Sequence, residues 1–225
     1  MIACVTVPYF AAAVERRDRT ALAETPLVIG GEPWETRPVY AFSEEAAVQG
    51  VFPRMSLRRA HLLSPQARFL PANQRHYRHA AAEVLDVLSE FTPLIQPDPL
   101  WLPDEVPQRP RTEPEQQLPA RYFIDLEQLS WAQTLRLSQE IGRTVRTTTR
   151  LSPAIGIATD AFTAAIAATS TRPHHLLPVA EMDTQRFITS KPLTFLPLEQ
   201  ETLRRLKLLG LRTVGEFMAL PLGLL

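Results

Sequence analysis

The order of apolar runs and amphipathic segments restricts the fold of this chain more than any other feature. Apolar runs of strand length lie at residues 2–7, 121–126 and 154–158, and helical patterns occupy 73–90 and 132–147. With one more strand after the first of these helices, the order is strand, helix, strand, strand, helix, strand, which is the ferredoxin-like arrangement. We therefore expect an α+β fold with a long insertion after the first strand.

The insertion between the first strand and the helix over 73–90 has elements of its own. Ser43 and Ser56 are good N-caps for short helices, because a serine hydroxyl accepts a hydrogen bond from a backbone N–H of the first turn. Gly50 suits the end of the first of these helices. The expected elements are a helix over 11–23, strands at 26–31, 39–42 and 67–70, and helices over 44–49 and 56–65.

Two further segments differ in character from the rest of the chain. Five prolines lie between Pro103 and Pro119, and proline removes a backbone donor and breaks a helix interior. We expect an irregular insertion there rather than a helix. Residues 198–220 instead show helical spacing of apolar side chains on both sides of 209–213, which predicts two helices joined by a turn.

The charge and cysteine content narrow the function only slightly. The chain carries 24 basic and 24 acidic side chains, so its formal net charge is zero. This balance gives no support to nucleic-acid binding, which often goes with a basic surface. The single cysteine, Cys4, excludes an intrachain disulfide. No apolar run has the length of a membrane span, and we expect a cytoplasmic protein without a membrane partner.

Four segments of the chain resemble the Y-family translesion DNA polymerases, in the same order and at similar spacing. The most specific is 152–158, which is followed by an alanine-rich helix and by Thr-Arg-Pro at 171–173. It resembles the last palm strand of that family and the helix after it. The other three segments are 9–15, 50–55 and 206–221. The last of these is similar to the helix–hairpin–helix of the family's thumb.

The resemblance implies a ferredoxin-like palm with inserted α/β fingers and a small helical thumb. The palm would comprise residues 1–9 and 72–168, with the proline-rich insertion at 103–119. The fingers would be residues 10–71, and the thumb, with its helix–hairpin–helix, would be residues 169–225. Members of the family continue with a little-finger domain, which we expect to be absent from this chain.

Nucleotidyl transfer in this family requires carboxylates that hold two divalent ions. By resemblance, the first aspartate falls on Thr6, whose neutral hydroxyl is a poor substitute for a bridging carboxylate. Without a gap, the family's Asp-Glu pair falls on Trp101 and Leu102; with a gap, Asp104 and Glu105 take those places. The metal site is incomplete in either alignment. We therefore expect no catalytic residue and no metal, with Mg²⁺ as a cofactor only if polymerase activity is retained.

The positions that would hold the incoming nucleotide differ from the family as well. Glu44 and Ala47 stand where the family has the tyrosine and arginine of a Tyr-Glu-Ala-Arg stretch, and carboxylates repel a polyphosphate. Ala161 replaces a lysine after the Gly-Ile-Ala strand, and Ala11 replaces a bulky residue that screens the sugar 2′ position. The resemblance therefore implies a pseudo-polymerase of the ImuB type, without a bound nucleotide.

DNA binding is expected at the helix–hairpin–helix, where backbone N–H groups at a helix start contact a phosphate. Gly210 permits the tight turn, and Thr213 suits the N-cap of the second helix. The nearby cations are Arg204, Arg205, Lys207 and Arg212. The alternative is an ordinary amphipathic helix pair, in which the apolar side chains only pack together.

We expect a non-catalytic, DNA-binding adaptor in DNA damage tolerance, acting in error-prone translesion synthesis during the SOS response. The partners that the resemblance implies are primer–template DNA, the sliding clamp, an ImuA-type protein and a separate error-prone polymerase. Two alternatives stay open. One is a weakly active translesion polymerase that uses Asp104 and Glu105; the other is a protein-interaction module that does not bind DNA.

Overall fold

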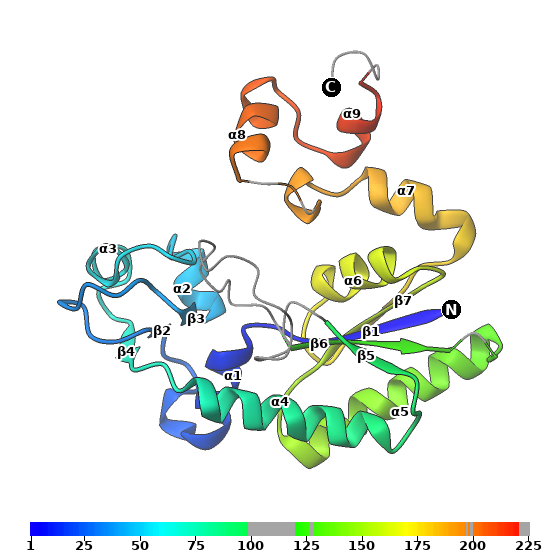
Figure 1. The fold of residues 1–225 in the computed structure, drawn as a ribbon, viewed down its shortest axis with the longest axis horizontal. Coiled ribbons are helices and arrows are strands. Elements are labelled where there is room, and N and C mark those ends of the chain that lie inside the picture. The colour runs from blue at the N-terminus through cyan, green and yellow to red at the C-terminus, as the bar shows by residue number, and fades with distance from the viewer. Residues whose placement is uncertain (99–119, 127, 197, 199, 221–225) are drawn as a thin grey trace, which may run out of the picture.

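The computed structural model describes residues 1–98, 120–126, 128–196, 198 and 200–220. Its larger sheet has five strands (Figure 1). The strand order is β5-β6-β1-β7-β8; β1 pairs antiparallel with β6 and β7, β5 pairs antiparallel with β6, and β7 pairs parallel with β8. The strands are β1 (Ile2–Val7), β5 (Ile95–Pro97), β6 (Ala120–Asp125), β7 (Ala154–Ala158) and β8 (Leu176–Pro178).

The expected α+β fold is confirmed by the order of these strands and their helices. With α4 (Gln74–Ser89) and α5 (Trp131–Thr149), the strands β1, β5, β6 and β7 follow the ferredoxin-like order strand, helix, strand, strand, helix, strand. Strand β8 was not predicted. It has only three residues, and it becomes a strand through its parallel pairing with β7.

The two faces of the sheet carry different helices (Figure 1). On one face, α4 and α5 pack against alternate residues of the strands; Val5 of β1 and Ile157 of β7 belong to this core. On the other face, α6 (Ala161–Ser170) packs its alanines against Cys4. Because side chains alternate along a strand, residue 6 of β1 faces the same side as Cys4, away from α4 and α5.

The insertion after β1 forms a three-stranded sheet in the order β3-β2-β4, with β2 and β4 parallel. Its core is built around the fully buried Val28 and Leu57. Its elements are α1 (Phe10–Asp18), η1 (Thr20–Leu22), β2 (Leu27–Ile29), β3 (Ala41–Phe42), α2 (Glu44–Val48), α3 (Leu57–Leu63) and β4 (Arg68–Leu70).

Two details of this insertion differ from the sequence prediction. The helix expected over 11–23 ends at Asp18, because the Arg16 guanidinium donates to the backbone carbonyls of Leu22 and Thr25 and holds a turn there. Ser56 caps α3 as expected. The Ser43 hydroxyl, however, is buried and accepts the N–H of Leu27 at 2.9 Å instead of capping α2.

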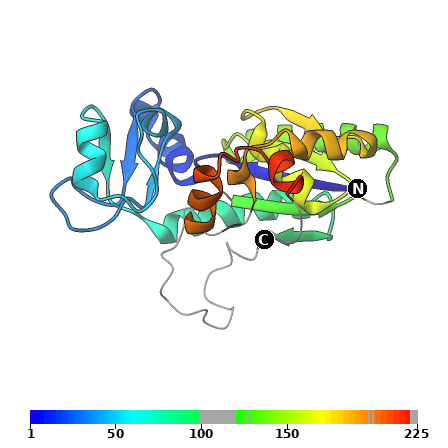
Figure 2. The same cartoon turned by 90° about the horizontal axis from the view of Figure 1, so that it is seen from above.

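The C-terminal segment leaves the large sheet and ends in the predicted helix pair, α8 (Gln200–Leu208) and α9 (Val214–Met218). In Figures 1 and 2 both helices lie on the same side of the five-stranded sheet as α6. The short elements before them are η2 (Glu181–Asp183), α7 (Thr184–Thr189) and η3 (Leu193–Phe195). The division into palm, fingers and thumb stays a prediction. In the described part of the chain, no helix has both the length and the apolar character that a membrane crossing needs.

Candidate functional site

Thr6, the predicted counterpart of the family's first aspartate, lies in the middle of the large sheet. It pairs with Arg121 of β6 on one side and with Ala154 of β7 on the other. Its side chain is buried, and its hydroxyl oxygen has no hydrogen-bond partner among the described residues. Position 6 is therefore neutral and enclosed.

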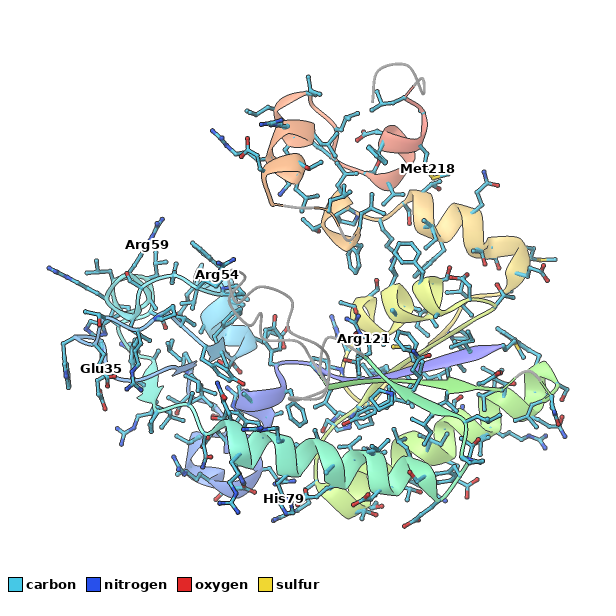
Figure 3. All side chains as sticks on the ribbon, in the orientation of Figure 1. Glu35, Arg54, Arg59, His79, Arg121 and Met218 are labelled. Carbon is cyan, nitrogen blue, oxygen red and sulfur yellow. The ribbon has the colours of Figure 1, made fainter. Side chains whose placement is uncertain are left out.

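A partly buried ion pair lies directly beside this position. The N–H of Asp98 donates to the carbonyl of Arg121 at 2.9 Å, which extends the pairing of β5 and β6 by one residue. The Arg121 Nη1 atom is 3.3 Å from the Asp98 Oδ2 atom, and the two side chains are 22% and 9% exposed. Figure 3 labels Arg121 at the sheet, on the side away from α4 and α5. A guanidinium therefore lies next to Thr6, and the nearby carboxylate is paired with it.

The third side chain on this part of the sheet is the Cys4 thiol. Burial raises its pKa to about 12; the Arg121 charge acts in the opposite direction, and the Asp98 charge adds to the rise. The thiol is thus protonated at neutral pH. Mg²⁺ prefers carboxylate oxygens and water in octahedral geometry, so a hydroxyl, a protonated thiol and a guanidinium do not fit it. Among the described residues, no group of three or more His, Cys, Asp or Glu side chains could hold a metal ion.

The second pair of metal-ligand positions cannot be placed in this sheet. Trp101 and Leu102, and the alternative candidates Asp104 and Glu105, lie outside the described residues. The assignment of this pair stays a prediction.

Glu44 and Ala47, the predicted triphosphate positions, lie on α2, and Phe42, just before this helix, packs edge-on against Tyr9. Tyr9 follows β1 and adopts a left-handed backbone conformation, with φ of 49°. The pKa of its hydroxyl is raised, first by burial and then by the negative charges of Glu44 and Glu45. Glu45 is itself paired with Arg16, at 2.7 Å, so it is mainly the charge of Glu44 that would repel a polyphosphate at the start of α1.

The start of α6 carries a carboxylate instead of a cation. Asp160 caps this helix, because its side chain accepts the N–H of Thr163 at 2.8 Å and the hydroxyl of Thr163 at 2.7 Å. Ala161, the position of the family's lysine, is the first residue of α6. Ala11 is buried in α1, packed in the main core. None of these three side chains brings a positive charge for a nucleotide.

The predicted hairpin is formed by the turn between α8 and α9. Gly210 has φ of 85°, the left-handed conformation that favours glycine, and open space around it. The Thr213 hydroxyl accepts the N–H of Glu216 at 3.2 Å, as expected of an N-cap. The Glu216 carboxylate in turn accepts the N–H groups of Arg212 and Thr213, at 2.6 and 2.9 Å. The backbone donors expected to contact a phosphate are therefore already bonded to a carboxylate.

That carboxylate is held in its charged form. The two backbone N–H groups of Arg212 and Thr213 lower the pKa of the Glu216 carboxyl. Of the four predicted cations, Arg204 and Arg205 form exposed ion pairs with Glu201, at 3.6 and 3.1 Å. Such pairs contribute little energy in water. Lys207 and Arg212 form no side-chain ion pair within the described residues, so the hairpin surface has cations free to meet a phosphate.

If duplex DNA contacts the hairpin as predicted, exchanging Glu216 for glutamine should tighten its binding about fivefold at low salt, since one negative charge near the phosphate is removed. The glutamine side chain keeps an oxygen that can accept the same N–H groups, so α9 should stay capped. Fluorescence anisotropy with a labelled duplex measures the effect. The matched control is Glu90→Gln at the end of α4, which also removes an exposed carboxylate and should not change the affinity. Equal affinities for Glu216→Gln and the unaltered chain would show that DNA does not approach this hairpin.

The pairing of Arg121 with Asp98 was not foreseen from the sequence. In the sequence, Arg121 is the polar first residue of an apolar run, and Asp98 lies between two prolines. The register of β1, β5 and β6 brings them together beside Thr6. The sequence does not specify this register directly, so the pairing of Arg121 with Asp98 could not be predicted from it.

Comparison with known sequences gives one family match and a set of relatives. Residues 5–169 match the model of the impB/mucB/samB family. The protein named DNA polymerase IV from Yersinia pseudotuberculosis serotype O:1b (strain IP 31758) is 30% identical over 222 residues, covering 97% of this chain and 58% of that protein. The one from Dehalococcoides mccartyi (strain CBDB1) is 28% identical, covering 98% and 53%. The chain thus spans little more than half the length of these relatives.

Solved structures of similar fold include DinB from Sulfolobus solfataricus, with a TM-score of 0.79 at 18% identity, covering 98% of this chain and 61% of that one. The insertion ternary complex of Dbh DNA polymerase has a TM-score of 0.77 at 19% identity, with the same coverage of 98% and 61%. At these identities the likeness shows the fold alone.

Proposed function

Since the chain belongs to the impB/mucB/samB family, within the Y-family DNA polymerases, we propose that it binds DNA in damage tolerance without catalysing nucleotidyl transfer itself. The observation that carries this proposal is the partly buried pair of Arg121 and Asp98 beside Thr6. The family's chemistry needs two divalent cations at the end of its first strand. In this chain, the guanidinium of Arg121, a monovalent cation, lies beside Thr6 at this position.

Electrostatics favours this proposal over a weakened metal site. A divalent ion next to Thr6 would have to approach the Arg121 guanidinium in an enclosed part of the sheet, where repulsion between like charges is less screened than in water. It would also need the Asp98 carboxylate, which would then leave its arginine. Both changes raise the free energy of metal binding, so Mg²⁺ is not expected at this position.

The role that fits these features is that of an adaptor in error-prone translesion synthesis. The protein would hold primer–template DNA through the hairpin cations Arg204, Arg205, Lys207 and Arg212, while a separate error-prone polymerase performs the chemistry. The sliding clamp and an ImuA-type protein are the further partners that we propose, together with a part in the SOS response. A cytoplasmic location belongs to the same proposal.

An active translesion polymerase is the second candidate, because the relatives are named DNA polymerase IV. In that case Asp104 and Glu105 would have to supply metal ligands. A third candidate is a protein-interaction module without DNA binding, which the zero net charge of the chain favours.

DNA binding is tested by titrating a fluorescent primer–template duplex at several salt concentrations. We expect the logarithm of the affinity to fall linearly with the logarithm of the salt concentration. In the double variant Lys207→Gln/Arg212→Gln the slope should shrink by about 2, one for each lost phosphate contact. The control is Arg75→Gln/Arg136→Gln, which removes two exposed arginines from α4 and α5 and should keep the original slope.

Binding that is absent, or that does not respond to salt, would contradict the DNA-binding part of the proposal. It would favour the protein-interaction module instead.

A further inference from the structure

A small pocket lies between α5 and the β8 edge of the large sheet. Its volume is about 180 Å³, and its lining comes from the middle of α5, the start of β7 and the turn that leads into β8. The pocket is separate from both Thr6 and the hairpin. Its lining residues with polar or charged side chains are Ser138, Gln139, Arg143, Arg146, His174 and His175, and Gly142 shapes it.

The charge at this pocket is positive and unpaired. Arg143 and Arg146 are exposed, and within the described residues their guanidinium groups form no hydrogen bond or ion pair. The rings of His174 and His175 likewise have no partner in the part of the chain that the structure describes. Glu140 is the single acidic residue of α5, and it does not line the pocket. The nitrogen-bearing side chains of Arg143, Arg146, His174 and His175, with Gln139 beside them, thus surround one small space.

The wall of the pocket contains a hydroxyl that no described residue satisfies. Ser138 is fully buried, and its oxygen has no hydrogen-bond partner among the described residues. A buried polar group without a partner costs free energy, and most such groups in proteins are satisfied by a ligand, an ion or water. The Ser138 hydroxyl is therefore an independent sign that the pocket holds something polar.

Local backbone features shape the pocket. Gly142 stands in the middle of the 19-residue helix α5, where glycine is unfavourable compared with alanine. A β-carbon there would lie 3.1 Å from the Ile155 side chain, so glycine lets α5 approach β7 closely. His174 adopts φ of 70°, and its N–H donates to the carbonyl of Pro153 at 2.8 Å. That turn fixes the two histidines at the rim.

We infer that this pocket binds a phosphate-type oxyanion, with Arg143 and Arg146 supplying the positive charge and Ser138 a hydroxyl donor. Guanidinium groups match the geometry of phosphate oxygens and form strong, charge-assisted hydrogen bonds with them. The volume is smaller than the roughly 300 Å³ of a pocket for a whole small molecule. It suits a single oxyanion group with its water molecules. The inference does not depend on the proposed function, and its failure would leave that function untouched.

The test is isothermal titration of the full chain with inorganic phosphate, at an ionic strength held constant with chloride. We expect saturable binding at one site. Each of the variants Arg143→Gln and Arg146→Gln should weaken phosphate binding about tenfold, because each removes one charge-assisted hydrogen bond. Arg136→Gln, on the same helix but outside the pocket lining, is the matched control and should bind phosphate as the unaltered chain does.

Ser138→Ala separates a binding role from a structural one. It should weaken phosphate binding, while the unfolding midpoint of the free protein stays the same or rises, because an unsatisfied buried hydroxyl has been removed. Absence of saturable binding to the unaltered chain would overturn the inference. Equal affinities for Arg143→Gln, Arg146→Gln and Arg136→Gln would overturn it as well.

The source of the oxyanion is distinguished by competition. If the phosphate belongs to a nucleic-acid end, a 5′-phosphorylated oligonucleotide displaces inorganic phosphate and its unphosphorylated counterpart does not. If a free anion is the ligand, neither oligonucleotide displaces it at equal concentration.

Discussion

Replacing Gly156 with alanine is expected to destabilise the folded chain severely. Gly156 lies in β7, directly under α6. An added β-carbon would lie 2.1 Å from the carbonyl oxygen of Ala164 and 2.3 Å from the backbone nitrogen of Ala168. Both contacts are with the helix backbone, so no side-chain rotation relieves them. Relief would require α6 to move away from β1 and β7, against which its alanines are packed.

The expected loss of stability from Gly156→Ala is more than about 4 kcal/mol, beyond the ordinary cost of overpacking because backbone atoms clash. Far-UV circular dichroism and urea unfolding measure it. The control is Ala158→Gly in the same strand, which removes a buried β-carbon and should cost only about 1 kcal/mol. A Gly156→Ala variant with an unfolding midpoint close to that of the unaltered chain would show that α6 does not pack on β7 in this way.

Removing the guanidinium in Arg121→Met is expected to lower the free energy of unfolding by about 3 kcal/mol, as for other buried ion pairs that lose one member. The Asp98 side chain is only 9% exposed, so solvation compensates little for the missing cation. Methionine keeps most of the apolar stem, which limits the loss of packing. Chemical denaturation at neutral pH measures the effect.

A double variant distinguishes the lost charge pair from lost packing. Arg121→Met/Asp98→Leu should be more stable than Arg121→Met alone, because no buried carboxylate is left without this arginine. The exposed Arg136 of α5 serves as the control, and Arg136→Met should change stability by less than about 0.5 kcal/mol. If the two single losses simply add in the double variant, Arg121 and Asp98 are not coupled.

Much of the fold was predictable because its elements have strong local signals. The buried runs at residues 2–7 and 154–158 and the amphipathic pattern over 73–90 correspond to β1, β7 and α4. The elements that were missed are short. β8 has three residues and α7 has six, too few for a periodic pattern, and tertiary pairing decides their conformation.

The site could be predicted only where the identity of a single residue decides it, and not where the pairing of several strands does. The neutral side chain at position 6 is read from the sequence alone, and its match to the family's first aspartate stays a prediction. The guanidinium beside it depends on the pairing of three strands, which local patterns do not specify. At the hairpin, Thr213 was recognised as an N-cap, but its reciprocal partner Glu216 was not considered, although Thr-x-x-Glu is the sequence pattern of a capping box. Because the Glu216 carboxylate accepts the N–H groups of Arg212 and Thr213, these donors are already engaged and are not offered to a phosphate.

The most direct test of the central claim is primer extension with Mg²⁺ and all four nucleotides, on a sample whose primer–template binding has been verified. We predict binding without extension, for the unaltered chain and also for Thr6→Asp, since a new carboxylate at position 6 would pair with Arg121. Template-directed extension by the unaltered chain that disappears in Asp104→Asn would contradict the claim. It would place the metal ligands outside the described residues.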